Sequence, residues 1–174
     1  MTSSRRLRRI VAQSNLAATY HELGRREQAL CVRRDVYSGT LKLHGEEHYD
    51  TLREACNYAT TLVTLERFEE AKSLLHRTLP VTRRVLGECD QFTLLMRWSY
   101  ALALFYADGS TLDDLREAVT ALEDTTRTAR RVFGNAHPTT ERIEVALRNA
   151  RADLRAALRA RESPPSPPPS SESV

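Results

Sequence analysis

The sequence has few of the residues that interrupt regular secondary structure. It contains 6 glycines and 7 prolines in 174 residues, and most of the prolines lie in the segment 163–174. The body of the chain therefore offers few turn signals, which disfavours an all-β sandwich. Aromatic residues make up 6% of the chain, whereas 41% of its residues are hydrophobic and 28% are charged. This composition is typical of a helical globular chain and not of a disordered one.

Several locations and partners are also disfavoured. No apolar run approaches the ~18 residues of a membrane-spanning helix, and the N-terminus lacks the apolar stretch of a secretory signal. We therefore expect a cytoplasmic chain that contacts no membrane. Its three cysteines, Cys31, Cys56 and Cys89, fit no metal-binding spacing and are expected to be reduced thiols. A net charge of +3 is too small to indicate a nucleic-acid partner.

Motifs for catalysis are missing as well. The chain has no glycine-rich loop that would hold phosphates, no nucleophile elbow and no dense carboxylate cluster. We therefore expect no catalytic residue, no enzyme activity and no cofactor.

What the sequence does contain is self-similarity. Residues 14–30 align with residues 56–72 at a spacing of 42. A third copy, residues 98–141, follows at a spacing of 47, because extra residues around "ADGST" lengthen a turn. In each copy, equivalent residues return in the same order: Asn15, Asn57 and Ser99; Ala17, Ala59 and Ala101; Ala29, Ala71 and Ala118; Gly45, Gly87 and Gly134; Thr51, Thr93 and Thr140.

Each copy predicts a pair of antiparallel helices. Apolar residues at helical spacing, such as Val11, Leu16 and Tyr20, define the first helix, which is expected to stop at Gly24. The second helix should run to Gly45, because glycine takes the left-handed conformation of a helix stop at little cost. The recurring alanines suit places where two helices cross closely. One pair cannot bury its apolar face alone, so neighbouring pairs are expected to stack.

The repeat also bears on the segment 44–48, "HGEEH", which fits the H-x-x-E-H signature of one class of zinc peptidases. His44 is replaced by Leu86 and Phe133 in the other copies, which indicates a packing position. A helix-ending glycine between the histidines would also keep them from sharing one face of a continuous helix. We therefore interpret the segment as a linker between repeats, with no metal ligand.

These features resemble tetratricopeptide repeats of the 42-residue kind found in kinesin light chains. The segment "VFGNAHPTT" is a close match to the linker of that family, and the resemblance covers roughly residues 8–158. It implies an all-α fold: a right-handed α-solenoid of about three and a half helix pairs. The repeat domain would cover residues 1–161, with units at about 8–47, 48–89 and 90–136 and a capping helix at 137–161.

Some residues depart from the family pattern. Glu66 stands in the second unit where the first has Gly24, and Asp90 replaces the linker histidine. Pro80 falls inside the second helix of its unit, where it is expected to kink the helix by removing one hydrogen bond.

In this family the first helices of the pairs line a concave groove that holds an extended peptide or a partner helix. Carried over residue by residue, the resemblance assigns these groove positions: Ser14, Asn15, Ala18 and His21; Arg53, Asn57 and Thr60; Trp98, Ser99 and Phe105. The same register includes Val11, Cys56, Val63, Leu95 and Leu102. Asparagine suits a groove because one amide both donates to and accepts from a peptide backbone. Only Arg53 is clearly basic, so a clamp for carboxylates is not expected.

Trp98 and Phe105 allow two interpretations. In the groove they would form an apolar anchor site of the kind that dominates binding energy. Alternatively, they cover the core under the long turn of the third unit. The sequence does not distinguish these alternatives.

Two C-terminal features, the arginine-rich last helix and the tail after it, are not expected to carry a specific binding site. In the last helix, Arg148, Arg151, Arg155 and Arg159 gather opposite an apolar stripe; they would attract an acidic partner or only solvate a capping helix, which we favour. Residues 162–174 are expected to form a disordered tail rich in proline and serine. Residues 161–167 fit a ligand pattern of proline-binding domains, but such patterns arise easily by chance.

The sequence thus predicts a non-catalytic scaffold that binds an unidentified protein or peptide. The alternative is the sensor arm of a larger kinesin-light-chain-like adaptor or nucleotide-switch regulatory protein. A zinc metallopeptidase is the third and weakest alternative.

Overall fold

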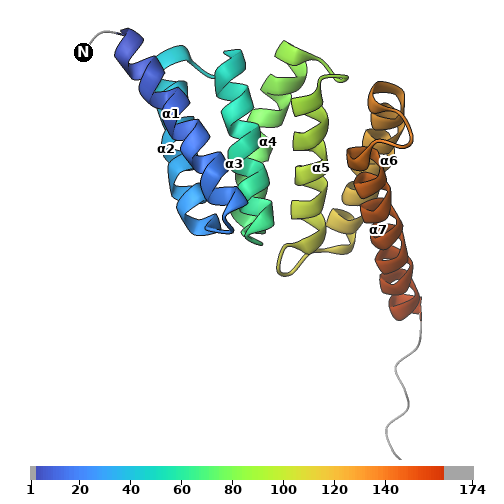
Figure 1. The fold of residues 1–174 in the computed structure, drawn as a ribbon. Helices are drawn as coiled ribbons and strands as arrows, with labels where there is room; N and C mark the ends of the chain where they lie inside the picture. Colours follow the sequence, from blue (N-terminus) through green and yellow to red (C-terminus); the bar gives the residue numbers. More distant parts are fainter. Residues whose placement is uncertain (1–2, 163–174) are drawn as a thin grey trace, which may run out of the picture.

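A computed structural model describes residues 3–162 of the chain. Within this range the chain forms seven α-helices and no strand (Figure 1). The helices are α1 (Ser3–Glu22), α2 (Arg26–His44), α3 (Tyr49–Thr64), α4 (Phe68–Leu86), α5 (Gln91–Tyr106), α6 (Leu112–Phe133) and α7 (Pro138–Glu162). The predicted all-α class is therefore confirmed. The tail predicted for residues 162–174 lies, apart from its first residue, outside the described residues.

The helices stack in sequence order as a solenoid. Helices α1 and α2, α3 and α4, and α5 and α6 form antiparallel pairs, and α7 packs against α6. In Figure 1 the turns within the pairs lie at one end of the array, and the linkers between pairs lie at the other. Two layers result, with α1, α3, α5 and α7 in front and α2, α4 and α6 behind. The arrangement confirms the predicted α-solenoid of helix pairs.

The recurring glycine ends the second helix of each pair, as the sequence predicted. Gly45, Gly87 and Gly134 have φ angles of +85°, +88° and +90°. Each donates its backbone N–H to the carbonyl four residues earlier, at 3.0 Å. A side chain at these positions would meet no atom within 4 Å, so the positive φ, and not lack of space, is what favours glycine.

The residue at the start of α3, α5 and α7 caps the helix through its side chain. His48 and His137 each accept, through Nδ1, a hydrogen bond from the backbone N–H two residues later, at 3.2 Å. Asp90 accepts the equivalent bond from Phe92 at 2.8 Å. A side-chain acceptor of this kind satisfies an otherwise unpaired N–H of the first turn. The replacement of the linker histidine by Asp90 therefore preserves the cap.

The recurring alanines lie in the packed interior between helices. All six are fully buried: Ala17, Ala59, Ala101, Ala29, Ala71 and Ala118. One apolar cluster lies around α3 and α4, and a second lies between α5, α6 and α7. Helix α4 continues through Pro80, which is exposed. The stacking of pairs therefore supplies the core that one pair lacks.

The front layer is not uniform. Among the described residues, α3 packs directly against α5, whereas the backbones of α1 and α3 lie further apart. The side chain of Glu54 lies at this wider junction and is only 1% exposed. The hydrogen bond from Ser14 to Glu54 therefore connects α1 to α3, whereas α2 packs directly against α3.

Candidate functional site

The front layer carries a recess bounded by α3, α5 and α7, with contributions from the first helix pair. Its volume is about 260 Å³. Five of the predicted groove residues line it: His21, Asn57, Thr60, Trp98 and Ser99. The predicted register is therefore brought together from three separate helices.

The walls of the recess combine apolar and hydrogen-bonding groups. Val63, Leu95 and Leu102 supply aliphatic surface. Thr60 donates its hydroxyl to the carbonyl of Cys56 at 2.9 Å, so its oxygen presents only lone pairs to a ligand. The same bond to the carbonyl four residues earlier is made by Thr61, at 2.8 Å. The threonines thus offer acceptors, and donors must come from other side chains.

Trp98 provides the aromatic wall of the recess. The guanidinium carbon of Arg142, on α7, lies 4.9 Å from the centroid of the Trp98 ring. A cation over an indole face at this distance is an attractive cation–π contact. The indole Nε1 is shielded from solvent and has no hydrogen-bond partner. Trp98 therefore holds one arginine in place and also presents an unsatisfied donor.

Arg33 adds a second unsatisfied donor from the rear layer. This α2 side chain lines the recess, and its Nε is shielded without a hydrogen-bond partner. Burial lowers the pKa of the Arg33 guanidinium, while the nearby Glu54 carboxylate acts in the opposite direction. A buried donor without a partner costs free energy.

The residues that line the recess are basic or neutral. Its lining includes Arg33, Arg142 and His21, and no carboxylate side chain. Glu54 does not line the recess, although it lies near Arg33 and accepts a hydrogen bond from Asn57. The lining itself therefore favours a ligand with negative charge or with several hydrogen-bond acceptors.

Glu54 organises the neighbouring polar cluster. Its carboxylate accepts hydrogen bonds from the Ser14 hydroxyl at 3.1 Å, from Arg53 Nε at 3.2 Å and from Asn57 Nδ2 at 3.4 Å. Arg53 also forms an ion pair with Asp50 at 2.9 Å. The cluster therefore orients the Asn57 amide, which lines the recess, and occupies Ser14 and Arg53.

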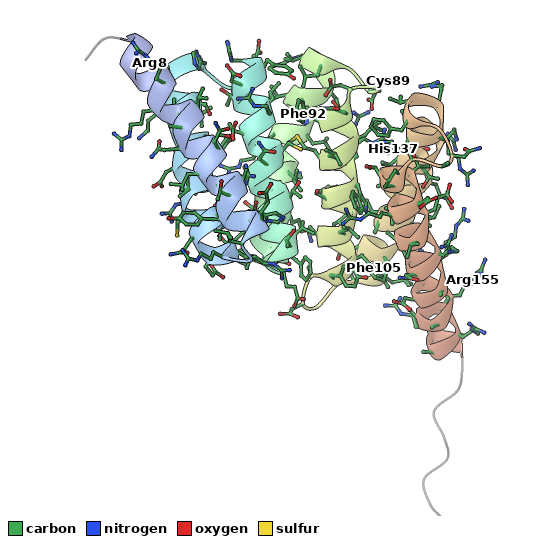
Figure 2. The ribbon with its side chains drawn as sticks, in the orientation of Figure 1. Arg8, Cys89, Phe92, Phe105, His137 and Arg155 are labelled. Atoms are coloured by element: carbon green, nitrogen blue, oxygen red, sulfur yellow. The ribbon has the colours of Figure 1, made fainter. Side chains whose placement is uncertain are left out.

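The other predicted groove residues lie outside the recess. Ser14 and Arg53 belong to the Glu54 cluster, Asn15 is exposed on α1, and Ala18 is half-buried there. Phe105 lies toward the end of α5 that carries the α5–α6 loop (Figure 2). Its ring packs edge-on against Tyr106, with centroids 4.6 Å apart. Trp98 and Phe105 both also pack against the second apolar cluster.

The prediction of a single groove arginine was incomplete, because Arg33 and Arg142 line the recess. Arg142 follows Leu95 by the 47-residue spacing of the third copy, so extending the groove register into the last helix would have found it. Arg33 comes from a second helix, outside that register. Glu54 aligns with Met96 and Ile143, which are fully buried. The sequence signal for Glu54 was therefore an acidic residue at a position that is apolar in the other copies.

Comparisons with known proteins identify the repeat. Residues 55–90 match the family model described as tetratricopeptide repeat. This match supports the predicted tetratricopeptide repeat for residues 55–90. The chain is also similar to the crystal structure of BtubC (BKLC) from P. vanneervenii, with 17% identity, a TM-score of 0.47, and coverage of 95% of this chain and 69% of that one. No curated protein matches the chain.

The family bears on function at a general level. Tetratricopeptide repeats generally mediate protein–protein interaction, and proteins built from them are generally scaffolds without catalytic activity. None of the helices formed by residues 3–162 combines the length and apolar character needed to span a bilayer.

Proposed function

We propose that the chain is a non-catalytic scaffold that binds a peptide segment or a helix of a partner protein in the groove formed by α1, α3, α5 and α7. The recess is the proposed centre of this groove. The observation that carries the proposal is a recess without a carboxylate in its lining, in which three helices bring together five predicted groove residues.

The chemistry of the recess supports a particular kind of segment. An acidic side chain or several backbone carbonyls would meet Arg33, Arg142 and the Asn57 amide. An adjacent apolar side chain would pack on Trp98 and on the aliphatic wall, as anchors in peptide grooves do. A longer ligand would continue along the front layer, past the remaining proposed groove residues: Ser14, Asn15, Ala18, Arg53, Ser99 and Phe105.

A recess-filling substitution tests this function. Peptides are first selected from a random displayed library on the wild-type chain, and their affinities are then measured by fluorescence polarisation. Thr60→Tyr fills the recess and should weaken binding by at least about tenfold, the loss of one anchor contact. Thr120→Tyr is the matched control, because Thr120 is also exposed and donates its hydroxyl to the carbonyl four residues earlier.

Two results would contradict the proposal. Selected peptides that bind both tyrosine variants as tightly as the wild type would place their site elsewhere. Equal loss in both variants, with unchanged circular dichroism, would indicate a non-specific effect of the added ring. Asn57→Ala provides a second recess variant and should also weaken binding.

The more specific family assignment is part of the proposal. The 42-residue spacing of Gly45 and Gly87, and the cap at the start of α3, α5 and α7, support the kinesin-light-chain-like type. We also propose a cytoplasmic location, which imaging of a fluorescent fusion would test.

Exposed apolar residues of α1 and of the turn after it support a second candidate, in which the array is the sensor arm of a larger adaptor or nucleotide-switch protein. Val11, Leu16 and Leu23 are 55%, 43% and 64% exposed. Another helical unit would bury this face, as α3 is buried by its neighbours. An in-frame nucleotide-binding domain in the flanking genomic DNA would favour this candidate, and flanking stop codons would exclude it.

A further inference from the structure

We propose that His44, His48 and Asp50 form a binding site for a divalent transition-metal ion such as Zn²⁺ at the linker between α2 and α3. One ligand atom from each of the three side chains lies within 4.8 Å of the other two. None of the three side chains lines the recess, although Asp50 is ion-paired with Arg53 of the Glu54 cluster. Zinc binding and peptide binding are therefore measured separately.

The distances approach those of a metal centre. Zinc binds histidine nitrogen and carboxylate oxygen at about 2.0–2.1 Å with tetrahedral geometry, which places two ligand atoms roughly 3.3 Å apart. His48 Nδ1 lies 3.7 Å from Asp50 Oδ2. The rings of His44 and His48 are stacked, with centroids 4.3 Å apart and an interplanar angle of 17°. The two rings would have to rotate out of this stack to direct one nitrogen of each toward a common ion.

One nitrogen of His48 already acts as an acceptor. Its Nδ1 accepts a hydrogen bond from the Asp50 backbone N–H at 3.2 Å, so this nitrogen carries a lone pair. Metal binding uses the same neutral form of histidine. The ion would therefore compete with one cap hydrogen bond and would not require a different tautomer.

An independent observation points to a missing ligand at His44. Its Nε2 is shielded from solvent and has no hydrogen-bond partner. Packing alone does not require a histidine here, because Phe133 stacks on His137 in the third linker, with centroids 4.9 Å apart. Figure 2 labels His137 at that linker. A metal ion would explain both the choice of imidazole and its unpaired nitrogen.

The combination occurs in only one of the three linkers of the described chain. The equivalent residues are Leu86, Asp90 and Phe92 in the second linker, and Phe133, His137 and Thr139 in the third. Two nitrogens and one carboxylate oxygen form a donor set that suits zinc, with water as the fourth ligand. The proposal differs from the sequence interpretation, which assigned no metal ligand to "HGEEH".

The site would be structural and not a peptidase centre. Gly45 ends α2, so the histidines belong to two elements and not to one continuous helix. The nearby Glu47 is ion-paired with Arg84. A bound ion would join the end of α2 to the start of α3 and so hold the first pair against the second.

The test uses the full chain without an affinity tag and Zn²⁺ alone as the probe. Isothermal titration calorimetry should show one ion per chain, and saturating Zn²⁺ should raise the thermal unfolding midpoint. His44→Phe preserves the stacked pair, as in the third linker, and should lower zinc affinity by at least about tenfold. Asp50→Asn should weaken binding in the same way.

Controls address the other zinc-binding groups of the chain. His76→Ala removes an exposed histidine of α4 and should leave the affinity unchanged. Cys89→Ser removes an exposed thiol and should also have no effect. Failure of the wild-type chain to bind Zn²⁺ would overturn the proposal. So would unchanged affinity and midpoint shift in His44→Phe with native circular dichroism.

Discussion

The hydroxyl of Ser14 donates a hydrogen bond to the carboxylate of Glu54 at 3.1 Å and connects α1 to α3. The backbones of these two helices lie further apart than those of α3 and α5, so the contact between α1 and α3 is made by polar side chains. Asn57, which lines the recess, donates to the same carboxylate. The wider junction and the recess therefore share one buried acid.

Removing the charge of Glu54 should weaken this junction. We expect Glu54→Gln to lower the free energy of unfolding by about 1–3 kcal/mol, the range for lost hydrogen bonds to a buried charged group. Ser14→Ala should cost much less in the Glu54→Gln background than alone, because its acceptor is already weakened. Urea unfolding of both single variants and the double variant measures this coupling.

The matched control is Thr120→Ala on α6, which packs against α5 and α7 and not against the Ser14–Glu54 junction. Its effect should add to that of Glu54→Gln within about 0.5 kcal/mol. If Ser14→Ala and Glu54→Gln were also additive, the two side chains would not be energetically connected.

Acid should selectively loosen the start of α6. The hydroxyl and backbone N–H of Thr111, followed by Lys72, stabilise the Asp114 carboxylate and lower its pKa from 3.8 to about 2. Because the folded pKa lies below the unfolded one, this stabilisation is complete above about pH 4 and is lost as the pH falls through about 2. Thr111→Ala should cost about 1 kcal/mol at neutral pH.

Thermal unfolding between pH 2 and 5 compares the two chains. The stability difference between wild type and Thr111→Ala should shrink as the pH falls, because acid removes the same contacts. A stability difference that stays constant over this pH range would show that Thr111 does not lower the pKa of Asp114.

Cysteine reactivity should separate the three thiols. Cys56 is 2% exposed, and burial raises the pKa of its thiol to about 12. Only the thiolate reacts readily with alkylating reagents. Cys31 and Cys89 are exposed, so N-ethylmaleimide at neutral pH should modify both quickly and Cys56 only after unfolding. Mass spectrometry counts the adducts, and rapid labelling of all three native thiols would contradict this burial.

The turn between α3 and α4 should improve with glycine. Glu66 has a φ of +60°, close to the +71° of Gly24 at the equivalent turn of the first pair. A side chain in this conformation costs about 1–2 kcal/mol, and the greater freedom of unfolded glycine offsets about 0.5–1 kcal/mol. Glu66→Gly should therefore raise the free energy of unfolding by up to about 1 kcal/mol. Gly24→Ala should lower the free energy of unfolding. If Glu66→Gly lowered this free energy and Gly24→Ala raised it, the positive φ of Glu66 would not be a source of strain.

Local chemistry explains what the sequence predicted well. The stops at Gly45, Gly87 and Gly134 follow from the backbone, and the buried alanines follow from the space that close crossings leave. Both signals recur with a fixed spacing, so each copy supports the others. The helix pairs and their stacking could therefore be predicted without knowledge of any long-range contact.

The composition of the recess was less accessible to sequence reasoning. Arg33 reaches it from the rear layer, so no register of first helices includes it. Ser14 and Arg53 fit the register but turn to Glu54, because a buried carboxylate requires partners. Which partner a polar side chain contacts depends on the neighbours that the fold brings near it, and a single sequence does not show these neighbours.

Trp98 allows a direct test of peptide binding in the recess, because it is the only tryptophan in the chain. Titration with a peptide selected on the wild type should shift the Trp98 emission and reduce its quenching by acrylamide, with saturation at one peptide per chain. In Thr60→Tyr the change should be absent at the same peptide concentrations, while Thr120→Tyr should respond as the wild type does. A peptide that binds tightly by fluorescence polarisation, yet leaves the emission and quenching of Trp98 unchanged, would contradict binding in the recess.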